Sequence, residues 1–179
     1  MNKKSKVILC LLTVAIILFC AVRFWIIPAN QAKEDQRLHN QTDALTHDIS
    51  AIEDCRAPYL GDASNVGGLF EALPLNDISR KFEIDSENCT LKVNYLDTVW
   101  NIGEEKVQRN LIYNSAAAMA AIDNLSGITY SFPDNSYSFS RIKMEAVFGS
   151  PLSNLLEEDN WSKKVQNKLN DMNFVGQFF

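Results

Sequence analysis

An apolar run near the N-terminus is the feature that most restricts what this chain can become. From Val7 to Ile27 the sequence carries a single charge, Arg23. About 20 apolar residues in a helix cross the hydrocarbon core of a bilayer, and Phe24 and Trp25 suit its interface. The sequence therefore predicts one transmembrane helix, with the lipid bilayer as the partner of this segment.

The residues around this run predict its orientation in the membrane and whether it is cleaved. Lys3, Lys4 and Lys6 precede it, and the positive-inside rule then leaves the N-terminus in the cytoplasm. A cleaved signal peptide is disfavoured because no small-residue cleavage pattern follows the run. A lipoprotein anchor at Cys20 is disfavoured because Phe19 stands where a small residue is required. We expect an uncleaved signal anchor in the cell membrane and an extracytoplasmic C-terminal domain.

Composition divides the chain into three parts. Residues 1–27 form the cytoplasmic tip and anchor, residues 28–47 a polar stalk, and residues 48–179 one domain. Four of the 17 basic residues lie in the first part, so the remainder carries 13 basic against 22 acidic residues. A part this acidic is a poor candidate for binding nucleic acid.

Catalytic patterns that depend on histidine, and metal-binding patterns, are missing from the sequence. The two histidines, His39 and His47, both fall in the stalk, without a cysteine or carboxylate at a ligand spacing. We expect both to be solvated, and we expect no metal and no cofactor. With no histidine in the domain, Ser-His and Cys-His nucleophiles fail, and no GxSxG or HExxH motif is present. The sequence predicts no catalytic residues and a protein that is not an enzyme.

The stretch from Pro58 to Pro74 predicts a short helix at the entrance to the domain. Asp62 or Ser64 can cap it, and apolar residues follow at helical spacing until Pro74 ends it. A pair of glycines, residues 67–68, suggests close packing against a strand, a helix that starts only at residue 68, or a phosphate cradle. The cradle is disfavoured because the Asp62 carboxylate would stand where the anion should bind.

The rest of the domain alternates between strand and helix periods. Residues 78–95 predict a hairpin, although Arg80 interrupts the apolar parity of its first strand, and residues 128–139 predict a second one. Residues 99–102 suggest an extension of the sheet or a third short strand, and residues 104–124 a central helix. Two further helices follow. The predicted fold is α+β, an antiparallel sheet of two hairpins packed by helices on one face.

Two features near the ends of the domain leave alternatives open. Cys55 and Cys89 would lie outside the cell, where a disulfide persists, but two buried free thiols fit the sequence equally well. The apolar C-terminal tail, residues 174–179, packs onto the domain or offers a contact to a partner. We expect packing, because exposed aromatic clusters are uncommon in soluble domains.

One block of the sequence resembles a bacterial domain-of-unknown-function family, number 4825. The block has the form Tyr-x-Gly-Asp-x-Ser-x-Val followed by Leu-Pro, here made by Tyr59, Gly61, Asp62, Ser64, Val66, Leu73 and Pro74. The later helix at residues 111–125 and Trp161 are similar to the family too. The resemblance implies a domain held outside the membrane of Gram-positive bacteria, alone or fused to sensor metallopeptidases of the antirepressor type. It implies no catalytic residues, and the absent HExxH removes the peptidase role.

These observations predict a function in broad terms. We expect a single-pass membrane-anchored domain that binds or senses at the bacterial cell envelope, with an envelope protein as a candidate partner. One alternative is an envelope hydrolase that uses two carboxylates. Another is a structural protein that dimerises through its stalk.

Overall fold

The computed structural model describes residues 3–179, with side chains from residue 11 onward except at Glu158. Within it the chain forms two compact units, Met1–His39 and Asn40–Phe179. The division falls within the predicted stalk. The predicted boundaries at residues 27 and 47 stay a prediction.

The first unit is helical. It contains α1 (Lys3–Ala21), a π-helical turn (Val22–Ile26) and the start of α2 (Ile27–Asn40). The π turn has a local cause in Pro28, whose ring would clash with the carbonyl four residues before it. The Ile27 N–H instead bonds to Val22 O, one residue further back than in an α-helix. Among the residues whose side chains are described, the helical stretch Leu11–Asn40 contains a candidate membrane span, and none of its most apolar window is buried. The helix is therefore long and apolar enough to cross a membrane.

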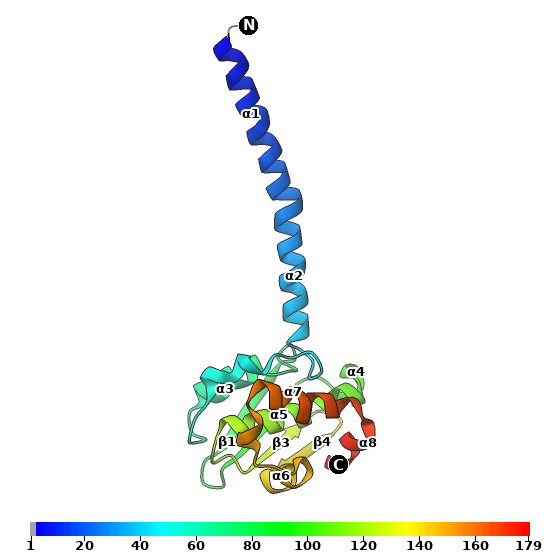
Figure 1. The fold of residues 1–179 in the computed structure, drawn as a ribbon. Coiled ribbons are helices and arrows are strands. Elements are labelled where there is room, and N and C mark those ends of the chain that lie inside the picture. The colour runs from blue at the N-terminus through cyan, green and yellow to red at the C-terminus, as the bar shows by residue number, and fades with distance from the viewer. Residues whose placement is uncertain (1–2) are drawn as a thin grey trace. The chain divides into compact units, whose positions relative to one another are not determined.

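The second unit contains the sheet and the remaining helices (Figure 1). Its strands are β1 (Arg80–Asp85), β2 (Thr90–Tyr95), β3 (Gly127–Ser131) and β4 (Ser136–Ser140). Its α-helices are α3 (Ala63–Ala72), α4 (Val99–Ile102), α5 (Glu104–Ala121), α6 (Arg141–Phe148), α7 (Glu158–Lys164) and α8 (Met172–Val175). Short 3-10 segments are η2 (Ile49–Cys55), η3 (Leu152–Leu155), η4 (Gln166–Asn170) and η5 (Gly176–Phe178).

The four strands form one sheet in the order β1-β2-β3-β4. Both predicted hairpins are confirmed, since β1 pairs with β2 and β3 with β4 in antiparallel fashion. The prediction of a wholly antiparallel sheet is wrong, because β2 and β3 pair in parallel. The cause is the connection between them, which runs through α4 and α5. A helical crossover of this length returns the chain to the same end of the sheet, as a parallel pair requires.

One face of the sheet is packed and the other is open. Leu91, Val93 and Tyr95 of β2 are buried, and Ile128 and Tyr130 of β3 lie beside them on the same face. Helix α5 contacts β3 and is buried from Asn110 to Ala121. The α+β class is therefore confirmed, with the core between the sheet and its helices.

The segment Val99–Ile102 is a short helix and not the predicted strand. Thr98 caps it by accepting the Asn101 N–H at 3.2 Å. Asp134, from the turn of the second hairpin, accepts the N–H groups of Val99 and Trp100 at 2.9 and 3.2 Å. Side-chain acceptors for the free N–H groups of a first turn stabilise a helix over an extended chain.

Helix α3 begins as its sequence predicts. The Asp62 carboxylate accepts from Ser64 N at 2.8 Å and from Asn65 N at 3.2 Å. The expectation that residues 67–68 permit close packing is wrong, because a Cβ added at either glycine meets nothing within 4 Å. Nothing in the structure explains this pair.

The C-terminal part ends in an aromatic cluster. Helix α6 is capped by Ser140, which accepts the Lys143 N–H, and it ends at Gly149, in the left-handed conformation. Phe174 and Phe178 pack on Phe148, and Phe179 contacts Tyr137. The expected packing of the tail onto the domain is confirmed.

Replacing the α3 cap tests its role in stability. We expect Asp62→Ala to lower the free energy of unfolding by about 0.5–2 kcal/mol, because two N–H groups lose their acceptor. Asp62→Asn keeps an acceptor and should stay within a few tenths of a kcal/mol of the wild type. Denaturant unfolding of the full chain in detergent micelles measures both. Equal stability of all three proteins would contradict a capping role.

Candidate functional site

The open face of the sheet is lined by polar side chains in three rows. Strand register sets these rows, because positions directly opposite one another share a face. One row runs Glu83, Lys92, Thr129, Ser138; a second runs Asp85, Thr90, Gly127, Ser140; the third runs Lys81, Asn94, Ser131, Ser136. On β3 and β4 every member is a hydroxyl residue or a glycine, so the side chains project only a short way above the sheet there.

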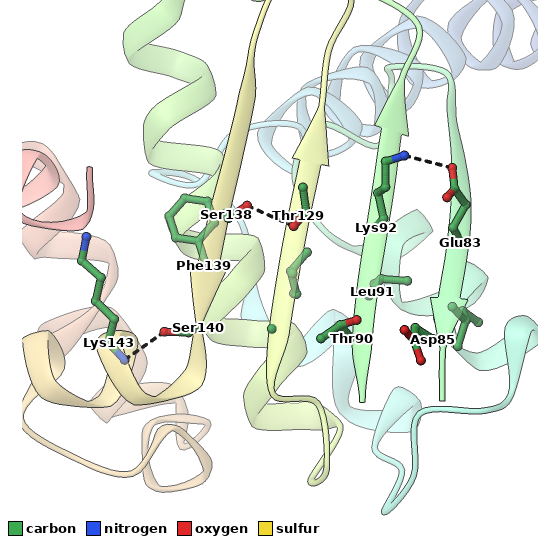
Figure 2. Close-up of a pocket in the computed structure, with 13 residues that line it drawn as sticks. Glu83, Asp85, Thr90, Leu91, Lys92, Thr129, Ser138, Phe139, Ser140 and Lys143 are labelled. Carbon is green, nitrogen blue, oxygen red and sulfur yellow. Dashed lines mark hydrogen bonds and ion pairs between the residues drawn. The ribbon is translucent and has the colours of Figure 1, made fainter. Parts of the chain in front are cut away.

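A hollow of about 750 Å³ lies over the first two rows. Gly127 has no side chain at its floor, and a Cβ there would meet only Thr90 Cγ2 at 3.5 Å and Phe139 O at 3.6 Å. Figure 2 shows Asp85 and Thr90 on one side of the hollow and Ser140 and Lys143 on the other. The missing side chain therefore opens the middle of the second row.

Hydrogen bonds fix the first row. Glu83 accepts from Asn94 Nδ2 at 2.8 Å and from Lys92 Nζ at 3.3 Å. Thr129 and Ser138 share a hydrogen bond of 3.0 Å between their hydroxyl oxygens. The bond from Asn94, followed by that from Lys92, lowers the pKa of the Glu83 carboxyl. Glu83 is therefore held as a carboxylate.

Opposite charges border the second row. On β1, Asp85 accepts from Asn88 Nδ2 at 2.7 Å and from Asn88 N at 3.0 Å, and these bonds lower the pKa of its carboxyl. Beyond β4, Lys143 projects from α6 and donates to Phe178 O at 2.5 Å. An ammonium group has three donors, so two remain for other acceptors. The hollow has a negative border at β1 and a positive one at α6.

A second group of interest is His47, which the sequence analysis misplaced. Its expected solvation is wrong, because the residue is only 3% exposed. Its Nδ1 lies 2.7 Å from Tyr113 Oη and its Nε2 lies 2.6 Å from Ala72 O. Burial lowers the pKa of the imidazole, against smaller opposing effects of the Ala72 bond and the Asp48 charge. Nothing in the polar sequence around His47 signals this burial.

The family motif lies at the start of the second unit and not at the hollow. Gly61, Asp62 and Ser64 are exposed and form the entry to α3, and Tyr59 is exposed beside them. Val66, Leu73 and Pro74 are buried. The structure therefore brings the motif residues together as a structural turn and helix.

The two cysteines of the domain are unpaired in the structure. Burial, and then the charge of Asp54, raise the pKa of the Cys55 thiol. Cys89 Sγ accepts from Asn124 Nδ2 at 3.4 Å. A disulfide between Cys55 and Cys89 stays a prediction. No cluster of metal-binding residues is present among the residues that the structure describes.

The residues around the hollow were not singled out from the sequence. The alternation that predicted the strands also placed their polar residues on one face, which was the available signal. Alternation alone does not show that the hydroxyl residues of β3 and β4 meet the charged residues of β1. That juxtaposition depends on the parallel pairing of β2 with β3.

Comparison with known families agrees with the fold and with the motif. The sequence profile of a family described as a domain of unknown function (DUF4825) matches residues 53–143, about half of the chain. The chain belongs to this family. Searches among curated proteins and among solved structures found no match.

The hydrogen bonds of Glu83 predict its titration. We expect Asn94→Ala to raise the pKa of Glu83 toward its usual range, because the largest stabilising contact of the carboxylate is lost. Carboxyl carbon shifts, followed by NMR while the pH is lowered, measure the change. Asn154→Ala, at an exposed position of η3, is the matched control and should leave Glu83 unchanged. An unchanged Glu83 midpoint in Asn94→Ala would contradict the assigned cause.

Proposed function

We propose that this chain is a single-pass protein of the bacterial cell membrane, whose extracytoplasmic domain binds a short peptide with free ends. The binding site is the hollow on the open face of the sheet. The observation that carries the proposal is the hollow at Gly127, bordered by Asp85 on one side and Lys143 on the other.

The membrane anchor is supported by the apolar helix and its flanking charges. A signal sequence would satisfy the same requirement of length and apolarity. The absence of a small-residue cleavage pattern after the run favours retention of the helix. Lys3, Lys4 and Lys6 favour a cytoplasmic N-terminus.

The dimensions of the sheet support a ligand of about four residues. Three steps between neighbouring strands span about 14 Å from β1 to β4. Four extended residues span at most about 13–14 Å. A peptide with free ends carries an ammonium at one terminus and a carboxylate at the other. Its charges therefore match Asp85 and Lys143, and the hydroxyls of Thr90 and Ser140 face its amide groups.

We propose a binding role in preference to catalysis. Glu83 and Asp85 lie two residues apart on one strand face, which is the kind of pair that a carboxylate hydrolase would use. Such a hydrolase needs one of its acids protonated near neutral pH, and their environments must push the two pKa values apart. Here hydrogen bonds lower the pKa of both groups. This favours two carboxylates that attract a cation.

The anchor has a direct test. We expect Ile17→Arg to reduce the share of the protein in the membrane fraction, because an arginine at the helix centre costs about 2.5–3.5 kcal/mol of insertion free energy. Ile17→Leu is the control. Protease added to intact spheroplasts should digest the domain. In a separate sample without protease, the intact mass of the membrane-bound chain should show that the N-terminal helix is retained. A protected domain, or a mass that lacks the helix, would refute this part of the proposal.

The binding site is tested with tetra-alanine as the probe, titrated into the full chain in detergent micelles and followed by NMR. Gly127→Val should weaken binding at least about tenfold, because its methyl groups enter the hollow while a strand accepts valine. Ser131→Val lies on the same strand and face, outside the hollow, and should bind like the wild type.

Capped probes test the charges at the two borders. Acetylating the probe should weaken its binding by about 2- to 5-fold, and Asp85→Asn should have a similar effect on the free probe alone. Amidating the probe should likewise weaken its binding by about 2- to 5-fold, and Lys143→Met should have a similar effect on the free probe alone. Equal binding of free and capped probes, or equal loss in Gly127→Val and Ser131→Val, would refute the site.

A further inference from the structure

His47 lies in a segment that joins α2 to the rest of the domain, residues 40–48. Several bonds hold this segment in place. Leu75 N donates to Thr42 O at 3.3 Å, and Ala44 N donates to Asn110 Oδ1 at 2.6 Å. Gln166 Nε2 donates to Ala44 O at 2.9 Å and to His47 O at 2.6 Å. The segment is therefore attached to the loop after α3, to α5 and to η4.

The imidazole of His47 adds two hydrogen bonds to this set, and together they require the ring to be neutral. Because a carbonyl only accepts, Nε2 carries the hydrogen that is donated to Ala72 O. Nδ1 then accepts from the Tyr113 hydroxyl. A second proton on Nδ1 would reverse that bond and place a positive charge in a buried site. Tyr113 in turn packs edge-on against Trp161, with ring centroids 5.0 Å apart, so its ring is held in place beside the imidazole.

The charged groups around His47 do little to stabilise a protonated imidazole. Its own segment brings Asp43, bonded to Leu45 N, and Asp48, which caps η2. The described side chains of the elements packed around it carry further charges. These are Glu71 on α3, which pairs with Arg80; Glu104, Glu105, Lys106 and Arg109 on α5, of which Arg109 pairs with Glu105; and Asp159, Lys163, Lys164 and Lys168 on α7 and η4. Of these Asp48 is the charge that acts on the imidazole, and it is exposed. The ring has no ion pair within the described side chains.

The backbone conformation of Leu75 is a second feature that favours separation of residues 40–48 from the elements they contact. Leu75 is fully buried and has a φ of 63°, in the left-handed region that residues with a side chain rarely adopt. Such a conformation persists where the surroundings impose it. The bond from Leu75 N to Thr42 O is part of those surroundings, so release of the segment also allows Leu75 to relax.

We propose that residues 40–48 form an acid-sensitive latch, which protonation of His47 releases from α3, α5 and η4 while the sheet stays folded. The direction follows from the site. Because burial lowers the pKa of folded His47, the released segment binds the proton more readily than the latched one. The latch is closed above the ordinary histidine pKa of about 6.5 and opens as the pH falls below it. An envelope domain of this kind would respond to external acid through its own attachment segment.

Hydrogen exchange of the full chain in detergent micelles tests the latch between pH 8 and pH 5. Protection factors of the Ala44 and Leu75 amides should fall on acidification, by up to about tenfold per pH unit, the slope for uptake of one proton. Amides of β2 should keep their protection over the same range. Unchanged protection at Ala44, or simultaneous loss in β2, would overturn the proposal.

Variants and NMR separate the latch from general acid unfolding. His47→Gln should remove the pH dependence of Ala44 protection, and His39→Gln, which alters an exposed histidine, should retain it. Labelled imidazole carbons report His47 of the wild type directly, and burial should place its titration midpoint below the ordinary histidine pKa of about 6.5. A pH response that survives in His47→Gln, or a His47 midpoint at or above that ordinary value, would refute the role of His47.

Discussion

Burial of α5 is the constraint on which the second unit depends. This helix contacts β3, α4, α6, α8 and the segments η2 and η3. Its alanines let these neighbours approach closely, and each of its buried polar residues, two asparagines and a serine, makes a specific bond. Asn110 accepts from Ala44, Asn114 donates to Pro74 O at 2.7 Å and Ser115 donates to Tyr130 at 3.2 Å. A buried polar group without a partner is costly. These three residues therefore fix where the attachment segment, the loop after α3 and β3 must lie.

The one-sided packing of the sheet follows from the same arrangement. Since the helices gather on the α5 side, the other face is left to residues that tolerate water. On β1 and β2 these are charged or amide side chains and Thr90, and on β3 and β4 they are small hydroxyl residues and Gly127. A face that only needed to be soluble could carry long charged side chains throughout. The low floor at Gly127 is what distinguishes this face from an ordinary solvated surface and makes it the candidate site.

Local patterns predicted the elements well, and contacts between distant segments caused the errors. Alternation gave both hairpins, and a capping residue gave the start of α3. Arg80 interrupts an apolar parity, yet it lies on the packed face because its guanidinium donates to the carbonyls of Phe70, Leu75, Asn76 and Ile78. Helix α4 depends on Asp134, far along the chain. His47 is buried by partners on α3 and α5. The sheet order and the hollow likewise depend on pairings that single-sequence periodicity does not contain.

The parallel pairing of β2 with β3 has a consequence for how the chain is made. Synthesis from the N-terminus completes the β1–β2 hairpin while α5 and β3 are still missing. Until they arrive, the apolar side chains of Leu91 and Val93 have no cover, and the inner edge of β2 has no partner. Exposed strand edges and apolar surface favour association with other chains. The nascent domain is therefore most vulnerable to aggregation between the emergence of β2 and that of β3, a window that a sheet built from successive hairpins would not have.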